Sequence, residues 1–592
     1  MTLYKIYTNK KNLSIGIALV CLVLVLLFSS CAKDYETVPL GQQSTLDLIF
    51  DVHDSAGINA IQYLNNVYND ALISGHNRVG GSNGDYIDAA SDDAVSSYTG
   101  LSSVEKIAEG AYTATQTNAD DIWTASYTTI RAATIFINNI DRVPLKELLP
   151  NGELARAAYR SEARFLRAWT YFELLRRYGG VPITKDSVYQ LTDNIDLPRE
   201  SFANTVTYIV SELSDIEDSL RPQEDVNSVN YGRITKGAAM ALKAKVLLYA
   251  ASPLFNGGNI DPSNPLTGYT NYDINRWKLA ADAAQDVINL GTYGLVSNYA
   301  DAFITQAEPI GTNTEAIFWR QNGGNTSVEQ TNGPIGYTSA GGNGRTSPTE
   351  NLVDAFPMSN GLPIDSAGSG YNPNDAYSNR DPRLKATVFY NGVLWLNRPV
   401  QTYDGGLDKP GGTLQQTKTG YYMRKFMGNF ETVNGSPVYS NTIHDWIYLR
   451  YAGVLLDYAE AENEYQGPSN EIYNILFSIR KRAGIDPGVN MNYGLALGMN
   501  QDQMRQTIRN ERRIEMAFEE QRYWDIRRWK IAADIYSQPL YGLDIQQTSQ
   551  GELFYNKTIV LQPNFIAPKM YLYPIPYSEV VKNTNMKQNP GW

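Results

Sequence analysis

Eight segments in which apolar residues recur every three or four positions restrict the folds that this 592-residue chain can adopt. They are 120–140, 155–180, 205–220, 235–255, 275–295, 450–465, 470–484 and 510–529. This spacing is typical of amphipathic helices that pack one face against a core. Several segments have a glycine at or near their end, where helices commonly close. The pattern predicts a mostly α-helical protein.

Small residues in two of these segments indicate close helix packing. Ala238, Ala239, Ala241 and Ala244 lie in one segment, and four alanines lie between 280 and 284 in another. Pairs of such helices resemble tetratricopeptide-type hairpins, but no strict repeat of about 34 residues is present. We therefore expect a degenerate helical superhelix. Between about 296 and 445, Gly, Asn, Ser, Thr and Pro interrupt short aromatic runs, which predicts long loops with short strands.

The N-terminus has the layout of a secretory signal. Three lysines precede an apolar run from Ile15 to Phe28, which is too short to span a bilayer of roughly 30 Å comfortably. Ser29 and Ser30 stand directly before Cys31, an arrangement that resembles the lipobox of bacterial lipoproteins, although Phe28 departs from it. Cys31 is the predicted lipidated (palmitate-bearing) N-terminus of the mature chain. The alternative is a signal-anchor helix with an incidental cysteine.

The net charge excludes some partners. Residues 1–30 contain three lysines and no acidic residue, so their removal changes the net charge from −12 to −15. Such a chain is not expected to bind nucleic acid or an anionic bilayer directly. The lipid alone is expected to hold it to the membrane, through a flexible tether that begins at Cys31.

The chain has few residues that could form a metal site or a phosphate-binding loop. Histidine occurs only at His53, His76 and His444, and no spacing matches a zinc site. No Walker-type loop is present. We expect neither a metal nor a cofactor.

The segment 510–529 combines carboxylates, arginines and large aromatic side chains, and its periodicity predicts a single helix. Four charged residues on its apolar face are predicted to be buried in a structural ion network: Glu511, Glu515, Arg522 and Asp525. Three others are predicted to point away: Arg513, Glu520 and Arg527. Buried carboxylates need partners, which Arg450, Arg480 and Arg482 could supply. The alternative, a glycoside hydrolase site, needs two acids that face each other across a cleft, whereas these acids align along one helix.

Several blocks across the mature chain carry a resemblance to one family, and they occur in that family's order. They include "EARFLRAWTYFELLRRYGGVPI" (162–183), "LPRESF" (197–202), "GRITKGAAMALKAKVLLYAASPLF" (232–255), "SPTENLVDAFPMSNG" (347–361), "NRDPRL" (379–384), "YLRYAGVLLDYAEAENE" (448–464), "RNERRIEMAFEEQRYWDIRRW" (509–529) and the terminal "QNPGW". The chain thus resembles the SusD/RagB family of outer-membrane nutrient-binding lipoproteins. The resemblance implies a SusD-like fold, a SusC-like TonB-dependent transporter as partner, an oligosaccharide as ligand and no catalysis.

The resemblance also divides the chain. It implies a signal peptide at 1–30, a tether at 31–45, a helical region with tetratricopeptide-like units at 46–325 and a RagB/SusD region at 326–592. It further implies a lipid-anchored protein at the cell surface. Peptide capture is the alternative within the family, and a surface glycoside hydrolase is a less favoured one.

Ligand sites in this family are expected on variable loops, so the candidates lie at 77–100 and near Trp319. Six residues have side chains suited to sugars, because aromatic faces stack on sugar rings and polar groups bind hydroxyls. They are Tyr98, Trp319, Tyr86, Arg78, Asp92 and Asn322. The alternative for each is ordinary packing or a solvated loop. The acidic chain favours a neutral or weakly charged oligosaccharide over a polyanion.

Overall fold

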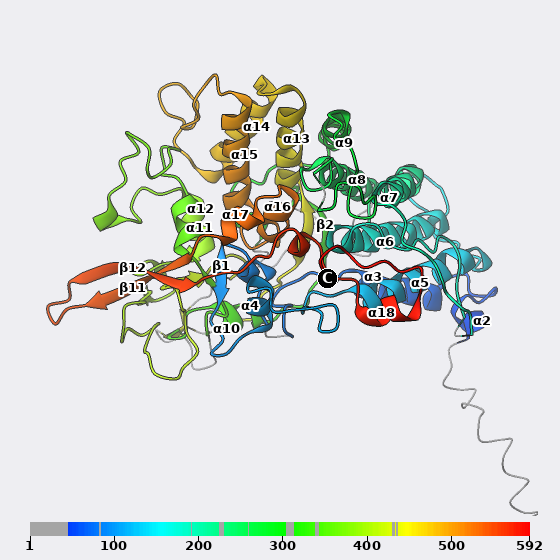
Figure 1. Ribbon diagram of the computed structural model, residues 1–592, viewed down its shortest axis with the longest axis horizontal. Coiled ribbons are helices and arrows are strands. Elements are labelled where there is room, and N and C mark those ends of the chain that lie inside the picture. Colours follow the sequence, from blue (N-terminus) through cyan, green and yellow to red (C-terminus); the bar gives the residue numbers. More distant parts are fainter. Residues whose placement is uncertain are drawn as a thin grey trace, which may run out of the picture.

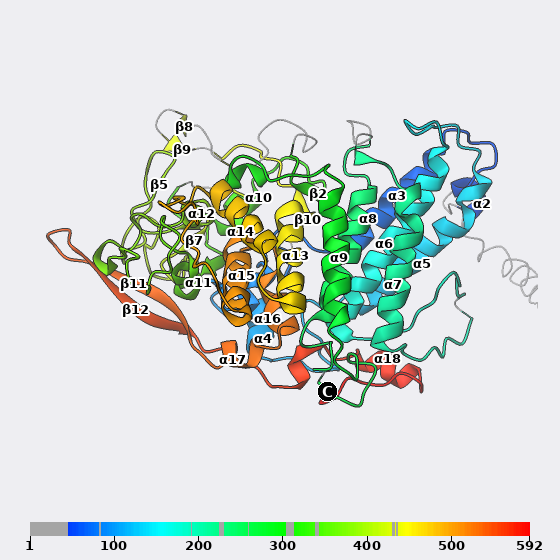
Figure 2. The same cartoon turned by 90° about the horizontal axis from the view of Figure 1, so that it is seen from above.

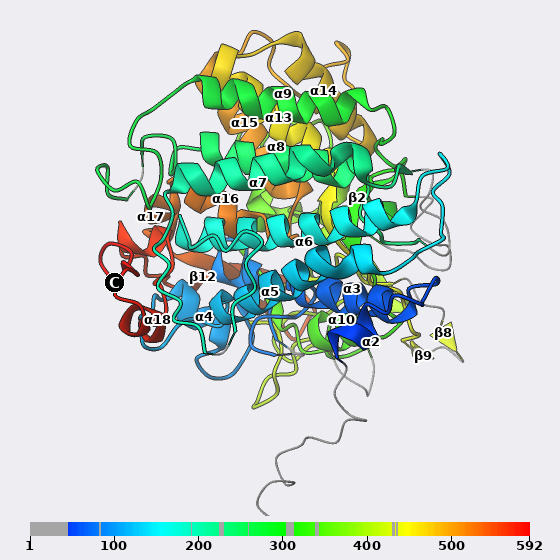
Figure 3. The same cartoon turned by 90° about the vertical axis from the view of Figure 1, so that its right-hand side faces the viewer.

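A continuous row of helices crosses the computed structural model from residue 58 to residue 515, as Figures 1 and 3 show. The structure describes residues 45–81, 84–190, 192–223, 230–258, 260–303, 313–337, 342–428, 432–433, 436–437 and 439–592. The predicted signal peptide, Cys31 and nearly all of the predicted tether lie outside these residues. Within the described residues, no helix is both long enough and apolar enough to cross a bilayer.

The helices of the row follow one another in space nearly as they do in sequence. They are α3 (Ile58–Ala71), α5 (Trp123–Asn139), α6 (Ala155–Tyr178), α7 (Phe202–Ile216), α8 (Lys236–Ala251), α9 (Asn275–Asn289), α13 (Tyr451–Gln466), α14 (Asn470–Ala483) and α15 (Gln501–Glu515). Each of α5 to α9 packs against the next, and α9 packs against α13. The predicted mostly helical, tetratricopeptide-like superhelix is confirmed.

Local sequence signals set the ends of these helices. The side chain of Ser201 accepts a hydrogen bond from the backbone N–H of Asn204 and so caps the start of α7. Gly179 ends α6 with φ +78°, and a Cβ there would lie 2.4 Å from the carbonyl oxygen of Leu266. Only glycine satisfies both conditions at this position.

Short helices complete the fold. They are α2 (Leu46–Ile49), α4 (Ser103–Ala108), α10 (Ser327–Asn332), α11 (Glu350–Ala355), α12 (Pro382–Thr387), α16 (Arg522–Arg528), α17 (Ala532–Tyr536) and α18 (Tyr577–Lys582), together with the 3₁₀ turns η1 (Ile87–Ala90) and η7 (Pro373–Asp375).

The strands form antiparallel pairs rather than one large sheet. The pairs are β1 (Ala94–Ser96) with β3 (Thr346–Pro348), β2 (Ala316–Arg320) with β10 (Trp446–Arg450), β4 (Val388–Phe389) with β7 (Tyr422–Met423), β5 (Leu394–Trp395) with β6 (Arg398–Pro399), β8 (Thr432–Val433) with β9 (Ser436–Pro437), and β11 (Leu540–Gln547) with β12 (Leu553–Leu561). The predicted loop-rich region with short strands is present between β2 and β10. The long hairpin β11–β12, which projects at one end in Figures 1 and 2, was not predicted.

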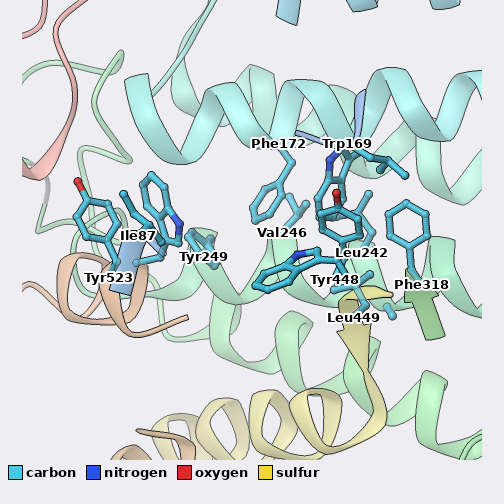
Figure 4. Packing of buried hydrophobic residues seen from close by; sticks show 14 of the residues in the cluster. Ile87, Trp169, Phe172, Leu242, Val246, Tyr249, Phe318, Tyr448, Leu449 and Tyr523 are labelled. Carbon is cyan, nitrogen blue, oxygen red and sulfur yellow. The ribbon is translucent and has the colours of Figure 1, made fainter. Parts of the chain in front are cut away.

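The main core lies between the helix row and the strand pair β2–β10. Figure 4 shows Trp169 and Phe172 of α6 facing Leu242 and Val246 of α8, with Phe318 of β2 and Tyr448 of β10 beside them. Both β1–β3 and β2–β10 join segments on either side of the predicted division between 325 and 326. The strand β2 is held along its edge by β10, and its Phe318 packs against Phe165 and Trp169 of α6.

Candidate functional site

Trp319 lies on the strand β2, not on a loop as the sequence analysis expected. Successive residues of a strand point to opposite faces. Phe318 therefore enters the core, whereas Trp319 turns to the other face, where it contacts Tyr231 with ring centroids 5.5 Å apart. The Trp319 side chain is only 3% exposed, and its Nε1 has no hydrogen-bond partner among the described residues. Its ring forms a floor rather than an open platform.

Above this floor lies a cavity of about 490 Å³, which we call the Trp319 cavity. Its lining residues are Asn65, Tyr68, Asn69, Leu72, Tyr231, Gly232, Arg233, Trp319, Arg320 and Gln321. Three aromatic rings and several amide side chains thus surround it. Tyr68 and Tyr231 are half-buried and hold fixed positions, because their hydroxyls donate to Glu162 at 2.8 Å and to Asp445 at 3.1 Å.

A second cavity of about 260 Å³ adjoins the first, and we call it the His76 cavity. It is lined by Ile73, Ser74, Gly75, His76, Arg78, Arg320, Asn322, Asn325, Ser327, Val328 and His444. Arg320 lines both cavities, and because of this shared residue we call the two the joined cavities. Its guanidinium donates to the carbonyl oxygen of Leu72 at 2.6 Å and has no carboxylate partner among the described residues. None of the described residues that line the two cavities is Asp or Glu.

Two of the three histidines of the chain meet in the His76 cavity. The rings of His76 and His444 have centroids 5.9 Å apart. Burial, and to a lesser extent the neighbouring His444, lowers the pKa of His76 from 6.5 to about 3. His76 is therefore neutral at physiological pH and presents a neutral imidazole to the cavity.

Asn322 also lines the His76 cavity, as a half-buried residue two positions after the end of β2. Its backbone N–H donates to Asp445 Oδ1 at 2.7 Å, and its Nδ2 donates to the carbonyl oxygen of His444 at 2.7 Å. These bonds fix the amide and leave its Oδ1 for a further donor.

The structure places three of the predicted ligand-binding residues in structural roles. Tyr86 is completely buried, so neither face of its ring is open to a ligand. Arg78 reaches the wall of the His76 cavity but is paired with Glu520 at 2.6 Å and Asp120 at 2.7 Å. Asp92 is paired with Arg522 at 2.8 Å and Arg513 at 2.9 Å. Their polar groups are occupied, and we do not carry them into the candidate site.

Tyr98 is the remaining predicted residue, and it lies apart from both cavities. It follows β1, is 44% exposed and lies under the guanidinium of Arg345, whose Cζ is 4.6 Å from the ring centroid. Trp319 and Asn322 are thus brought together in the joined cavities, and Tyr98 is not. Sequence reasoning missed Tyr68, Tyr231 and Arg320, which come from three separate segments that meet only in the fold.

The charged segment 510–529 is not one helix. α15 ends at Glu515, the chain turns through Phe518 and Glu520 with φ +62° and +57°, and α16 starts at Arg522. The prediction that three charges point away was wrong: Glu520 and Arg527 are buried at and beyond this turn, and Arg513, which precedes it on α15, is half-buried. Glu520 pairs with Arg78, Arg513 pairs with Asp93 at 2.7 Å, and Arg527 stacks on Tyr523 at 3.6 Å.

The four residues predicted to form the ion network are all buried and paired. Glu511 contacts Arg383 at 2.7 Å and Arg480 at 2.8 Å. Arg522 holds Asp92, and Asp525 contacts Arg512 at 2.7 Å. Burial alone would raise the pKa of Glu515, but the guanidinium groups of Arg482, Arg450 and Arg383 outweigh it and hold the pKa well below its usual range.

Comparisons with known proteins agree with this architecture. Residues 303–592 match the family described as SusD family, and residues 46–248 match one described as starch-binding associating with outer membrane. SusD-like protein P2 of Formosa agariphila is 36% identical over 149 residues, which are 25% of this chain and 26% of that protein.

Solved structures share the fold over nearly the whole described chain. The crystal structure of a SusD-like protein from Bacteroides fragilis has a TM-score of 0.73 at 27% identity and covers 93% of this chain and 100% of its own. A laminarin binding SusD-like protein has a TM-score of 0.62 at 20% identity, with 91% and 100% covered, and that likeness concerns the fold alone. With the helix row, the strand pairs and both family matches in agreement, this chain belongs to the SusD/RagB family.

Proposed function

We propose that this protein is a lipid-anchored nutrient-binding protein, exposed at the cell surface of the outer membrane, that captures oligosaccharides in the joined Trp319 and His76 cavities. The observation that supports this proposal is the composition of the Trp319 cavity. Its aromatic rings offer apolar surface for sugar rings, and Asn65, Asn69 and Gln321 offer amides for hydroxyls. Membership of the SusD/RagB family supports the same ligand class and a SusC-like TonB-dependent transporter as partner.

The composition of the cavities also supports binding without cleavage. Hydrolysis of a glycosidic bond generally needs two carboxyl groups roughly 5 to 9.5 Å apart across the sugar. The described residues that line the two cavities supply none. We therefore propose that the protein is not an enzyme and that its ligand leaves unchanged.

The acidic chain and the guanidinium of Arg320 together determine how much negative charge the ligand can carry. The acidic chain as a whole disfavours a polyanion through like-charge repulsion. A single guanidinium without a carboxylate partner can nevertheless hold one acidic group in a bidentate fashion. The proposed ligand is accordingly a neutral or weakly charged oligosaccharide.

Calorimetry of the mature chain tests this proposal against maltoheptaose, laminarin oligosaccharides, a sulfated glycan, a uronate-rich glycan and a mixed peptide library. We expect binding of a neutral or weakly charged glycan with a Kd in the micromolar to millimolar range. Asn69→Ala and Trp319→Ala are expected to weaken it by about tenfold. Asn69 is exposed, so its replacement leaves the fold intact even where loss of the buried Trp319 ring lowers stability.

Tyr272→Ala is the matched control, because this tyrosine is exposed and lines neither cavity. Chromatography of the glycans after incubation is expected to show no products. Reproducible bond cleavage, or tight binding to peptides or polyanions only, would refute the proposal. Unchanged neutral-glycan binding in both cavity variants would place the site elsewhere and refute the Trp319 cavity.

A further inference from the structure

A third cavity, of about 540 Å³, lies at the end of the molecule that carries the hairpin β11–β12. We call it the Tyr390 cavity. Its lining includes Tyr371, Tyr377, Tyr390, Asn391, Lys385 and Tyr555, and it shares no lining residue with the Trp319 or His76 cavities. In Figures 1 and 2, β12 and α12 lie at the end of the molecule with the projecting hairpin, well separated along the long axis from α3 and β2.

Tyrosine rings from three separate segments converge on this cavity. Tyr371 and Tyr377 flank η7, Tyr390 follows β4, and Tyr555 comes from β12. Tyr377 and Tyr390 stack with centroids 4.1 Å apart and planes 14° from parallel, so each ring has one face covered by the other. Tyr555 is 40% exposed. The site thus holds aromatic surface in a fixed orientation, and part of that surface is open.

A buried chain of hydrogen bonds fixes the wall of the Tyr390 cavity. The hydroxyls of Tyr377 and Tyr421 lie 3.0 Å apart, and the Tyr421 hydroxyl donates to Glu350. On the other side, Asn391 accepts from the backbone N–H of Thr402 at 2.9 Å and donates to the Tyr555 hydroxyl at 3.4 Å. The rings are therefore positioned before any ligand arrives, which reduces the entropy cost of binding.

Polar side chains surround the rings and leave donors and acceptors for a ligand. Asn374, Asp375 and Ser378 come from the segment around η7. Lys385 is exposed and has no carboxylate partner among the described residues, whereas Lys557 is paired with Asp354 at 2.9 Å. Amide, hydroxyl, carboxylate and ammonium groups beside tyrosine faces form the combination that suits a polyhydroxylated ring.

We infer that the Tyr390 cavity is a second carbohydrate-binding site, which takes a short stretch of a neutral oligosaccharide against Tyr390 and Tyr555. The inference extends the proposed function and rests on the same ligand class. The volume falls within the roughly 300 to 1,000 Å³ of small-ligand sites. Two separated sites on one molecule bind a long polysaccharide more tightly than a short oligosaccharide, because the second contact becomes intramolecular.

The test begins with a glycan array of neutral and acidic oligosaccharides, followed by calorimetry of the mature chain with the best short ligand. We expect two sites per molecule. Tyr555→Ala and Lys385→Ala are expected to weaken one site by about tenfold and to leave the other unchanged. The affinity of Tyr555→Ala for the corresponding polysaccharide is expected to fall towards that for the short ligand.

Phe554→Ala is the matched control. Phe554 is the neighbour of Tyr555 on β12, points to the opposite face of the hairpin and is 53% exposed. Unchanged stoichiometry and affinity in both Tyr555→Ala and Lys385→Ala would overturn the second site. If Asn69→Ala then still weakened glycan binding, the proposed function would stand without the second site. Absence of glycan binding by the wild-type chain would overturn both.

Discussion

At the scale of single residues, the structure depends on buried charges that are each balanced by several partners. Glu515 contacts Arg383 at 2.9 Å, Arg450 at 2.8 Å and also Arg482, and none of these side chains is appreciably exposed. Bringing such charges out of water is costly, and their mutual attraction offsets the cost only while the set is complete. Each charge therefore contributes to stability mainly because it keeps the other buried charges paired.

We expect Glu515→Ala to lower the free energy of unfolding by on the order of 3 kcal/mol, because it leaves buried guanidinium groups without a partner. Urea denaturation of the mature chain measures this change. Glu552→Ala is the control, since Glu552 is exposed and makes no ion pair among the described residues. Equal stability of the two variants would show that the network around Glu515 carries no such cost.

Glu350 predicts a pH dependence of stability. Burial and, to a lesser extent, the nearby Asp354 raise the pKa of Glu350 from 4.5 to about 7. Between these two values the folded state binds more protons than the unfolded state, so the unfolding free energy falls as pH rises. The stabilising contribution is complete below about pH 4.5 and is lost by the time pH passes about 7. The total change in unfolding free energy from this group is on the order of 3 kcal/mol.

Glu350→Gln removes this proton exchange and keeps the shape of the side chain. We expect the variant to be more stable than the wild type at pH 8 and no more stable at pH 4. Urea denaturation at both values measures the difference. A stability difference between the two proteins that stays constant with pH would contradict the raised pKa.

At the scale of elements, periodicity in the sequence predicted the long helices and missed two features for physical reasons. Apolar spacing identifies a helix such as α6 because one face of it is buried all along its length. The turn between α15 and α16 escaped, because Phe518 and Glu520 adopt left-handed backbone that tertiary contacts impose and local sequence does not signal. The hairpin β11–β12 escaped because its second strand is largely exposed and lacks a clear apolar alternation.

The candidate site was predictable only in part. Trp319 and Asn322 were found because their residue types suit sugars, and the same reasoning selected the buried Tyr86, since residue type does not reveal burial. Arg320 and Tyr231 join the site only because the end of α3, the segment around Tyr231 and β2 meet at one cavity. The Tyr390 cavity gathers residues between 350 and 557, and no local pattern connects them.

The start of α15 carries a testable capping box. The Asn500 side chain accepts from the backbone N–H of Gln503 at 2.9 Å, and the Gln503 side chain accepts from that of Asn500 at 3.0 Å. We expect Asn500→Ala to cost about 1 kcal/mol of stability, because it leaves an N-terminal N–H of the helix unsatisfied. Thermal denaturation measures it. Asn69→Ala, on the exposed face of α3, is the control and is expected to show no such loss of stability. An equal loss in both variants would show that the capping box is not what stabilises the protein at Asn500.

At the scale of the whole molecule, the two family matches describe regions that are interlocked in space. The strand pair β1–β3 takes one strand from the matched region 46–248 and one from the matched region 303–592. Ion pairs such as Arg78 with Glu520 add further cross-links between the ends of the chain. The Trp319 and Tyr390 cavities, which are separated along the long axis, therefore belong to one connected body.

Attachment to the membrane is predicted to depend on Cys31, which lies outside the described residues. Because a lipid on Cys31 is the proposed attachment to the membrane, we expect Cys31→Ala to release the protein from the membrane fraction. Cell fractionation with metabolic lipid labelling measures this. Cys21→Ala is the control and should leave both localisation and labelling unchanged. Membrane retention and lipid labelling of the Cys31 variant would refute the anchor.

The ion pairs between distant segments also govern when the protein can fold. Asp92 and Arg522 are 430 positions apart, so at 5 to 20 residues per second the ribosome needs about 20 to 90 s to deliver the arginine after the aspartate. For nearly all of that interval Asp92 lacks both Arg513 and Arg522, and Arg78 has Asp120 but not Glu520 as a partner. Such a chain is expected to fold late and as a unit, which would agree with the secretion that the predicted signal peptide implies.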